Sequence, residues 1–212
     1  MERATALLLA GGVGNRLGAL TKQRAKPAVP FGGIYRLIDF TLSNAANSNV
    51  SRLGVLTQYQ PLTLLEHIWK GETWGFDKEG RSLELLPPKD GEAVREYYYG
   101  TADAIRKNLD FVLDEPDHDA IVVLSGDHIY GMDYGEFVRH HRESGADVTV
   151  ATTEVNPADA NQFGIAELDE QHRVLSWEEK PLRPKSNVAS MGVYVFKKEF
   201  LIDLLTECEG HD

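Results

Sequence analysis

The sequence contains little cysteine, no long apolar run and no leader-like N-terminus. Its single cysteine, Cys208, has no partner for an intrachain disulfide, which favours a reducing compartment and an inert, buried thiol. No run of about 18 apolar residues occurs, as a membrane-spanning helix would require. The first residues also lack the charged and then apolar pattern of a signal segment. We therefore expect a cytoplasmic protein with no membrane partner.

Positive charge is scarce, and its distribution is uneven. The chain has 22 Lys and Arg residues against 33 Asp and Glu residues, a formal net charge of -11. This balance argues against a nucleic-acid partner, because such binding needs a basic face that neutralises many phosphates. Four of the cations nevertheless gather within residues 16–26: Arg16, Lys22, Arg24 and Lys26. Cations so close together repel each other, so the cluster predicts an anionic ligand.

Several familiar catalytic and cofactor-binding motifs are absent. The sequence has no G-K-[ST] phosphate loop, and Leu17 stands where the dinucleotide fingerprint needs its third glycine. It also lacks H-E-x-x-H and G-x-S-x-G, so zinc-hydrolase and serine-esterase chemistry have no support. His140 and His141 are adjacent and face different sides of a helix, which is poor zinc geometry. We expect residues 117–119, Asp-His-Asp, to form a solvated polar turn.

The chain length and the order of its elements predict one α/β domain. With 212 residues, 42% of them hydrophobic, the chain is long enough for one well-filled core. Apolar runs alternate with amphipathic patterns, as expected for βαβ units and a mostly parallel sheet. The predicted strands cover residues 4–10, 52–57, 120–125, 146–152 and 190–196, with a hairpin over 163–179. The predicted helices cover residues 197–208 and 101–115, the latter capped by Thr101 or Asp103 and ended by Pro116.

Three glycines follow the first predicted strand, in the segment AGGVGNRL at residues 10–17. Glycine lets the backbone turn with positive φ and approach phosphate oxygens closely. The glycines alone are equally well explained by a tight strand-to-helix turn. The nearby cations favour phosphate, because Arg16 has a planar fork suited to bidentate contacts and Lys26 supplies a point charge. Lys22 and Arg24 are expected to be solvated surface charges.

Together these motifs carry a resemblance to a known family. AGGVGNRL followed by RAKPAVPFGG resembles the N-terminal signature of the sugar nucleotidyltransferases, which join a sugar 1-phosphate to a nucleoside triphosphate and release pyrophosphate. Within that group the chain is similar to the glucose-1-phosphate adenylyltransferase family, which makes ADP-glucose for glycogen or starch. The segments that carry this similarity, in chain order, are YRLIDFTLSNAANS, GVLTQYQ, YYYGTADAIRKNLD, SGDHIYGMDY, FGIAELDE, WEEKP and SMGVYVF. The resemblance implies a Rossmann-like, GT-A-like α/β fold, with a mostly parallel mixed sheet flanked by helices and a β-hairpin insertion.

The resemblance also implies roles for individual residues. The catalytic residues would be Arg16, Lys26 and Asp127, with Lys26 on a phosphate of the reacting pair and Asp127 on Mg²⁺. The triphosphate would be cradled by Gly11, Gly12, Gly14 and Arg16. The base and ribose would be bordered by Gln58, Gly100 and Thr101. Glucose 1-phosphate would be held by Tyr98, Gly164, Glu179, Lys180 and Ser190, with Glu179 on sugar hydroxyls and Lys180 on the phosphate.

The position of Asp127 supports the implied magnesium site independently. It follows the strand at 120–125, at the carboxyl edge where open α/β sheets bind their ligands. Magnesium prefers a hard carboxylate combined with substrate phosphates over an all-protein cage. Taken alone, an Asp in this place is more often a turn or helix cap, and Lys180 beside Glu179 is more often an exposed ion pair.

The sequence leaves several questions open. Tyr97 and Tyr99 depart from the residues common in the family, and Gln23 stands where enterobacterial members carry an activator-binding lysine. Two alternatives are a transferase that uses dTTP or UTP and a non-catalytic regulatory subunit. The family continues beyond Asp212 with more of the core, a second metal-binding Asp and a left-handed β-helix. We therefore interpret residues 1–212 as the N-terminal part of a nucleotidyltransferase catalytic domain, from a homotetramer that responds to small-molecule effectors.

Overall fold

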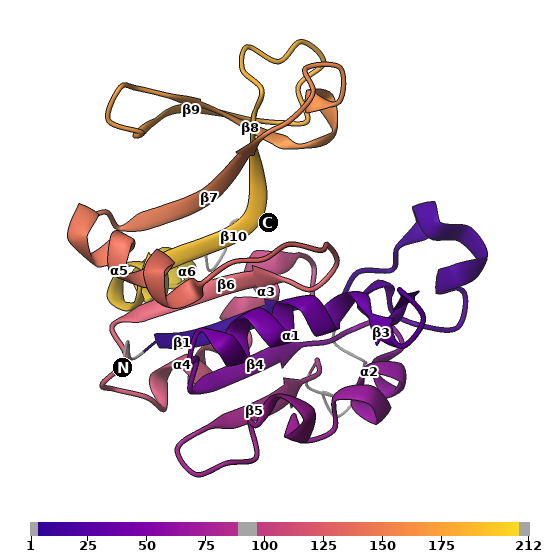
Figure 1. Ribbon diagram of the computed structural model, residues 1–212. Helices are drawn as coiled ribbons and strands as arrows, with labels where there is room; N and C mark the ends of the chain where they lie inside the picture. Colours follow the sequence, from indigo (N-terminus) through magenta and orange to yellow (C-terminus); the bar gives the residue numbers. More distant parts are fainter. Residues whose placement is uncertain (1–3, 89–96, 208–212) are drawn as a thin grey trace. The chain divides into compact units, whose positions relative to one another are not determined.

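The computed structural model describes residues 4–88 and 97–207 (Figure 1). Cys208 lies outside the described residues. The chain divides into two compact units, the first formed by residues 1–148 and 195–212 and the second by Thr149–Tyr194. Each unit is described by itself below.

A parallel sheet forms the centre of the first unit. Four strands lie in the order β5 (Ser82–Leu86), β4 (Arg52–Leu56), β1 (Ala4–Leu9) and β6 (Ala120–Ser125). All three neighbouring pairs are parallel, and β1 has β4 on one side and β6 on the other. The predicted α/β fold with a mostly parallel sheet is confirmed, as are three of its buried strands. The edge strand β5 was not predicted, because its sequence SLELL is neither continuously apolar nor β-branched.

Helices cover both faces of this sheet, which explains why its strands are continuously apolar. Leu7 lies with Phe111 of α4 on one face, whereas Leu8 lies with Ile38 of α1 on the other. Figure 1 shows α1 lying across the sheet. The helical elements of this unit are η1 (Asn15–Thr21), η2 (Lys26–Ala28), α1 (Leu37–Asn47), α2 (Pro61–Ile68), η3 (Glu72–Trp74), α3 (Thr101–Arg106), α4 (Leu109–Leu113), α5 (Tyr134–Ser144) and α6 (Lys198–Glu207).

The helix predicted over 101–115 is wrong in one respect, because two short helices stand in its place. The helices α3 and α4 are separated at Asn108, whose backbone leaves the helical region. The Asn108 amide donates to the Ala104 carbonyl at 2.8 Å and to the Tyr98 hydroxyl at 2.9 Å. Neither proposed cap acts through a side-chain bond to the helix, and Asp103 instead accepts from the Tyr99 N–H at 3.0 Å. Leu113, the last residue of α4, is 50% exposed.

The second unit contains the predicted hairpin. Strands β8 (Gly164–Leu168) and β9 (Val174–Glu179) pair antiparallel, which confirms the prediction over 163–179. Strand β10 (Val188–Lys197) pairs antiparallel with β8, and β7 (Val148–Glu154) also pairs with β10. The short helix η4 (Ala160–Gln162) precedes β8. A small core of Ala160, Ile165 and Ala189 holds these elements together.

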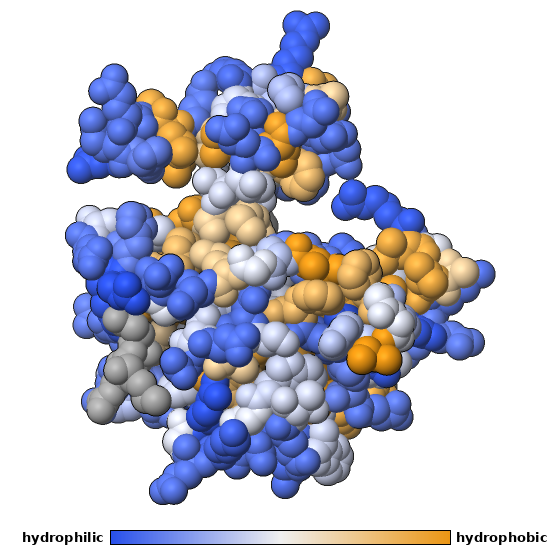
Figure 2. Space-filling view, in the orientation of Figure 1, coloured by the Kyte–Doolittle hydropathy of each residue, from blue (hydrophilic) through white to orange (hydrophobic). Residues whose placement is uncertain are grey.

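One group of exposed hydrophobic side chains in the first unit lies at a small hairpin, β2 (Pro30–Phe31) and β3 (Tyr35–Arg36). Phe31, Ile34 and Tyr35 are exposed there, and the rings of Phe31 and Tyr35 contact Phe40 of α1. Figure 2 shows hydrophobic side chains gathered on the side where β3 lies. Among the described residues, no helix is both long enough and apolar enough to span a bilayer.

Candidate functional site

The glycine-rich loop leaves β1 and turns back toward its own cation cluster. Gly14 has a φ of 69°, in the left-handed region that glycine adopts without steric cost. Its carbonyl accepts from the Leu17 N–H and from the Thr21 hydroxyl, both at 2.9 Å. The Lys26 N–H donates to the Gly12 carbonyl at 3.3 Å. The loop is therefore folded so that Lys26 lies directly beside the glycines.

Lys26 and Asp127 meet although 101 residues separate them. The Lys26 Nζ donates to Asp127 Oδ2 at 2.7 Å, and the Ser125 hydroxyl donates to Oδ1 at 2.6 Å. Asp127 lies just beyond the end of β6, and the Gly126 N–H donates to the Leu9 carbonyl at the end of β1. The ends of two adjacent parallel strands thus bring the predicted phosphate-binding lysine and the predicted metal ligand into one ion pair.

The carboxyl group of Asp127 is held in its ionised form. The largest cause is the His128 imidazole, whose Nδ1 lies 3.6 Å from Oδ1, and it lowers the pKa of Asp127 well below its usual range. Partial burial acts in the opposite direction, whereas the bonds from Lys26 and Ser125 lower the pKa further. A carboxylate that stays ionised near neutral pH is suited to binding a cation.

A cavity of about 310 Å³ opens at this edge of the sheet. Volumes in this range accommodate small-molecule ligands, and such sites combine apolar walls with a few polar groups. It is lined by Leu9, Gly11, Gly12, Pro27, Leu56, Gln58, Tyr98, Gly100, Thr101, Ala104, Ser125 and Asp127. The structure thus brings together six of the predicted nucleotide and metal residues: Gly11, Gly12, Gln58, Gly100, Thr101 and Asp127.

Gln58 and Tyr98 both line this cavity and are hydrogen-bonded to each other. The Gln58 side-chain carbonyl accepts from the Tyr98 N–H at 2.9 Å. The Tyr98 hydroxyl donates to the Leu86 carbonyl at 3.2 Å and accepts from Asn108. Burial raises the pKa of Tyr98. Its side chain therefore stabilises the wall of this cavity, and its role toward glucose 1-phosphate stays a prediction.

The remaining predicted sugar-phosphate residues lie in the second unit. Gly164 is opposite Glu179 in the β8–β9 pair, and Lys180 follows directly. The Lys180 Nζ donates to Glu179 Oε1 at 2.5 Å. Lys180 has a φ of 47°, a left-handed conformation uncommon for a residue with a side chain, and its N–H donates to the Phe163 carbonyl at 3.0 Å. Ser190 Oγ accepts from the Gly192 N–H at 3.0 Å and lies 3.2 Å from the Tyr194 hydroxyl.

Three cations of the loop differ from Lys26 in having no acidic partner among the described residues. Within residues 4–88 and 97–207, Arg16, Lys22 and Arg24 form no ion pair. Arg16 and Lys22 are exposed, whereas Arg24 is half-buried. Arg16 is not among the residues that line the cavity. The prediction of an anionic ligand for this cation cluster therefore still stands.

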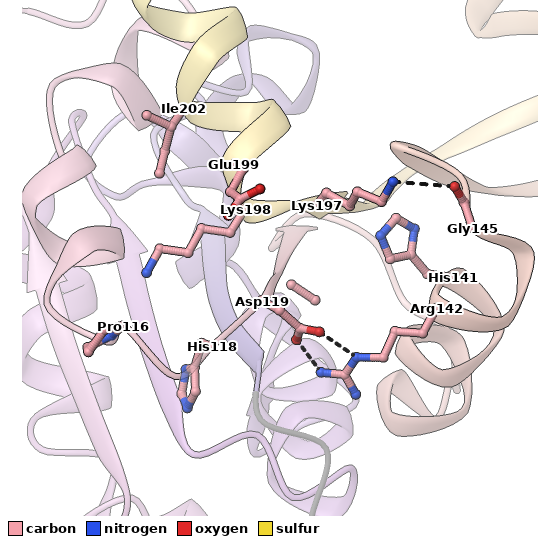
Figure 3. Close-up of a pocket in the computed structure, with 11 residues that line it drawn as sticks. Pro116, His118, Asp119, His141, Arg142, Gly145, Lys197, Lys198, Glu199 and Ile202 are labelled. Carbon is pink, nitrogen blue, oxygen red and sulfur yellow. Dashed lines mark hydrogen bonds and ion pairs between the residues drawn. The ribbon is translucent and has the colours of Figure 1, made fainter.

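A second cavity, of about 500 Å³, lies near the amino end of β6 (Figure 3). Three cations line it, and each already has an acceptor. Arg142 donates to both carboxylate oxygens of Asp119, Lys197 donates to Asp147 and to the Gly145 carbonyl, and Lys198 donates to the Glu115 carbonyl. These bonds tie α5 and α6 to the start of β6. The cations around the cavity are therefore explained by contacts within the protein.

Two histidines near this cavity test the expectations drawn from the sequence. His118 is not solvated as expected, since it is only 7% exposed and its Nδ1 lies 2.8 Å from the hydroxyl of Thr5, itself buried in β1. His141 is buried and His140 is exposed, which confirms that they face different sides of α5. No group of three or more His, Cys, Asp or Glu residues suited to a metal occurs among the described residues.

Burial of His141 predicts a pH dependence of folding stability. Burial is the main cause that lowers the pKa of His141, Lys197 adds to it, and Asp119 and Asp147 partly oppose it. The unfolded state therefore binds the proton more readily, and stability falls as pH drops below the unfolded value of about 6.5. Urea unfolding of a His141→Gln variant is expected to show a shallower loss below this pH, by at most about 1.4 kcal/mol per pH unit. Equal slopes for the variant and the parent chain would contradict this.

Comparisons with known proteins show which family this chain is similar to. The family model described as Nucleotidyl transferase matches residues 5–212. The glucose-1-phosphate adenylyltransferase of Thermotoga neapolitana is 50% identical over 99% of this chain and 49% of its own length. The protein of that name from Bacillus licheniformis is 51% identical over 98% of this chain and 55% of its own length. The protein of that name from Clostridium acetobutylicum is 50% identical over 95% of this chain and 53% of its own length. The chain thus spans about half the length of the curated relatives it matches.

Proposed function

The chain belongs to the nucleotidyl transferase family, and on that premise we propose that it transfers the adenylyl group of ATP to α-D-glucose 1-phosphate. The products are ADP-glucose and pyrophosphate, and the reaction is the first committed step of glycogen or starch synthesis. The names of the relatives support this substrate pair. The observation that carries the proposal is the cavity at the ends of β1, β4 and β6, where the glycine loop, Gln58 and the Lys26–Asp127 pair meet.

The proposed reaction is a phosphoryl-type displacement that needs no general base. An oxygen of the sugar phosphate forms a bond to the α-phosphorus of ATP, and the bond from that phosphorus to the bridging oxygen of the leaving pyrophosphate breaks. A phosphomonoester has a second pKa near ~6, so its oxygen is already largely deprotonated at neutral pH. What the protein must supply is alignment of two anions and stabilisation of the charge that develops on the pyrophosphate.

Cationic side chains supply that stabilisation in the proposed mechanism. Arg16 and Lys26 act on the phosphates of ATP, and Lys180 acts on the phosphate of the sugar. In the structure Lys26 neutralises Asp127, and it would exchange this carboxylate for a phosphate oxygen when the nucleotide enters. The loop therefore tolerates the mutual repulsion of its cations because a triphosphate completes it.

The residues at the end of β6 fit a magnesium ion. Asp127 offers an ionised, hard oxygen ligand, partly exposed and lining the cavity. Magnesium is commonly bound by one or two carboxylates together with substrate phosphates and water. We propose that Asp127 holds it, and the ion would supply Lewis-acid stabilisation of charge on the phosphates. Ser125 and His128 would orient the carboxylate through their contacts with Oδ1.

Equilibrium binding of ATP to the chain in the presence of Mg²⁺ tests the proposal. ATP is expected to bind in preference to dTTP, UTP and GTP offered as competitors, and glucose 1-phosphate is added second. An Arg16→Ala variant is expected to bind ATP about tenfold or more weakly, because a charge-assisted phosphate contact is lost. Lys22→Ala is the matched control, since Lys22 is an exposed cation of the same loop without an ion pair to a described residue.

The outcomes separate the proposal from its alternatives. If dTTP or UTP binds in preference to ATP, the chain transfers a thymidylyl or uridylyl group and the adenylyl assignment is wrong. Saturable binding of ATP without any binding of glucose 1-phosphate would favour a non-catalytic regulatory subunit. Equal weakening by Arg16→Ala and Lys22→Ala would mean that the loop attracts ATP only by its net charge.

Three parts of the proposal remain. A cytoplasmic location is inferred from the single cysteine and the lack of long apolar runs. A homotetrameric assembly and regulation by small-molecule effectors rest on the family resemblance. Gln23 stands where enterobacterial relatives have an activator-binding lysine, so the proposal assigns no particular effector.

A further inference from the structure

The face of the β8–β9 hairpin that carries Glu179 also carries a tryptophan. Gly164 is paired with Glu179, and Ala166 is paired with Trp177. Side chains alternate along a strand, so Trp177 and Glu179, two residues apart, point to the same side of the hairpin. Paired residues lie side by side across an antiparallel ladder, which places Gly164 and Ala166 on that side as well. Sequence reasoning had singled out Gly164 and Glu179 but not Trp177.

Gly164 makes room for both of these side chains. A Cβ atom added to Gly164 would lie 2.6 Å from Trp177 Cζ2 and 2.9 Å from Glu179 Oε2. Its backbone does not require glycine, because no positive φ is recorded for it. Glycine is needed here for space, since the indole ring and the carboxylate both lie over its Cα. The ring and the carboxylate are therefore immediate neighbours on one patch of the sheet.

Three chemically different groups thus stand together on the hairpin. Glu179 supplies acceptor oxygens, Lys180 supplies a cation bonded to that carboxylate, and Trp177 supplies a large aromatic ring. Trp177 remains 39% exposed, so its ring is only partly covered by the protein. Ligand sites characteristically combine an apolar or aromatic wall with a few polar groups that fix orientation. A pyranose 1-phosphate has matching parts: hydroxyls, a phosphate, and a ring edge of C–H groups.

We propose that Trp177 is a binding residue for glucose 1-phosphate, whose sugar ring packs against the indole while Glu179 bonds its hydroxyls. This inference rests on the proposed function, which assigns Glu179 and Lys180 to that substrate. Trp177 contributes apolar contact area at a small entropic cost, because its ring is already held over Gly164. It fixes the tilt of the sugar, and through it the direction in which the phosphate oxygen points. Gly164 acts indirectly, as a positioning residue for the indole and the carboxylate.

Calorimetric titration with glucose 1-phosphate measures the contribution of the ring. Trp177→Ala is expected to weaken binding about tenfold, and Trp177→Phe to restore most of the affinity, because an aromatic wall is retained. In steady-state assays the alanine variant is expected to raise the KM for glucose 1-phosphate and leave the KM for ATP within about twofold of the parent. A residue that only stabilised the fold would change both constants or neither.

Intrinsic fluorescence provides a second readout, since the chain has only three tryptophans. A saturable change on adding glucose 1-phosphate is expected in the parent chain and in Trp69→Phe. The same change is expected to disappear in Trp177→Phe. Trp69 is the matched control, because it is an exposed tryptophan in the first unit, at the end of α2.

Each result decides between two statements. If the parent binds glucose 1-phosphate and Trp177→Ala binds it equally well, Trp177 is no part of the sugar site, and the proposed function is unaffected. If Trp177→Phe keeps the fluorescence change, the ring is not next to the ligand. If the parent does not bind glucose 1-phosphate at all, the proposed function itself is wrong, and the inference falls with it.

Discussion

An Asp127→Ala variant is expected to lose pyrophosphate release by at least about a thousandfold at saturating substrates. The carboxylate is the metal ligand predicted within residues 1–212, and its removal takes a protein ligand away from magnesium. ATP binding should survive, because Lys26 loses its carboxylate partner and becomes free to contact phosphate. The measurement is pyrophosphate release as a function of magnesium concentration, together with ATP affinity. The separation of lost turnover from retained binding is the expected signature.

Asp147→Ala is the matched control for this loss. Asp147 is also paired with a lysine, its Oδ1 lying 2.8 Å from Lys197 Nζ, and it does not line the nucleotide cavity. Its replacement should leave turnover within about twofold of the parent, as exposed ion pairs contribute little. Turnover of Asp127→Ala within tenfold of the parent, with an unchanged magnesium requirement, would contradict the assignment.

The protonation state of Asp127 adds a pH signature to the same experiment. Its pKa lies well below the usual carboxyl range, first because of His128 and then because of Lys26 and Ser125. The group is therefore ionised throughout the neutral range, and its protonation begins only below the ordinary value of about 3.9. Protonation of Asp127 should therefore not lower the turnover of the parent above about pH 5. An acid limb in this range must belong to the sugar phosphate or to another residue.

The parts of the fold that could be predicted are those set by local pattern. Strands β1, β4 and β6 are buried on both faces, so each is a continuous apolar run that can be read from the sequence. The hairpin β8–β9 has its polar turn at residues 169–173, where Asp169 accepts from two backbone N–H groups. These features depend on neighbouring residues and hardly on the rest of the chain.

The errors come from contacts between distant segments. The break at Asn108 is stabilised by the Tyr98 hydroxyl, and no local pattern announces that partner. His118 was expected in solvent because its neighbours are acidic, yet the hydroxyl of Thr5 binds it in the interior. The edge strand β5 is half-exposed, and its pairing with β4 rather than its own composition makes it a strand.

For the candidate site, residue types could be predicted but their pairings could not. The sequence pointed to Lys26 and Asp127 separately, whereas their ion pair depends on β6 lying next to β1. Gly164 was assigned to the sugar phosphate, and the structure gives it a reason to be glycine, the space taken by Trp177 and Glu179. A signal for Trp177 was nevertheless present, because alternation in the predicted strand places it on the same face as Glu179.

Gly14→Ala is expected to disrupt the proposed nucleotide site. The substitution leaves the side chains proposed to contact ATP, such as that of Lys26, chemically unchanged. The added Cβ would lie 2.8 Å from Lys26 Cβ and 3.0 Å from Thr21 Cγ2, distances that tightly packed atoms do not tolerate. The backbone cannot readily move away, since the Gly14 carbonyl accepts two hydrogen bonds. Its positive φ adds a conformational cost of about 1–2 kcal/mol. Lys26 must therefore shift from its place beside the glycine loop, and ATP should bind at least about tenfold more weakly.

Gly18→Ala separates the steric effect from the conformational one. Gly18 also has a positive φ, 54°, but apart from its chain neighbours no atom of the described residues lies within 4 Å of the position its Cβ would take. This variant should lose stability in urea unfolding and still bind ATP within about twofold of the parent, because Lys26 stays in place. Gly14→Ala should lose both stability and ATP affinity. If the two variants lose ATP affinity equally, strain in the loop rather than the position of Lys26 governs nucleotide binding. If Gly14→Ala binds ATP normally, the close approach of this glycine to Lys26 has no functional consequence.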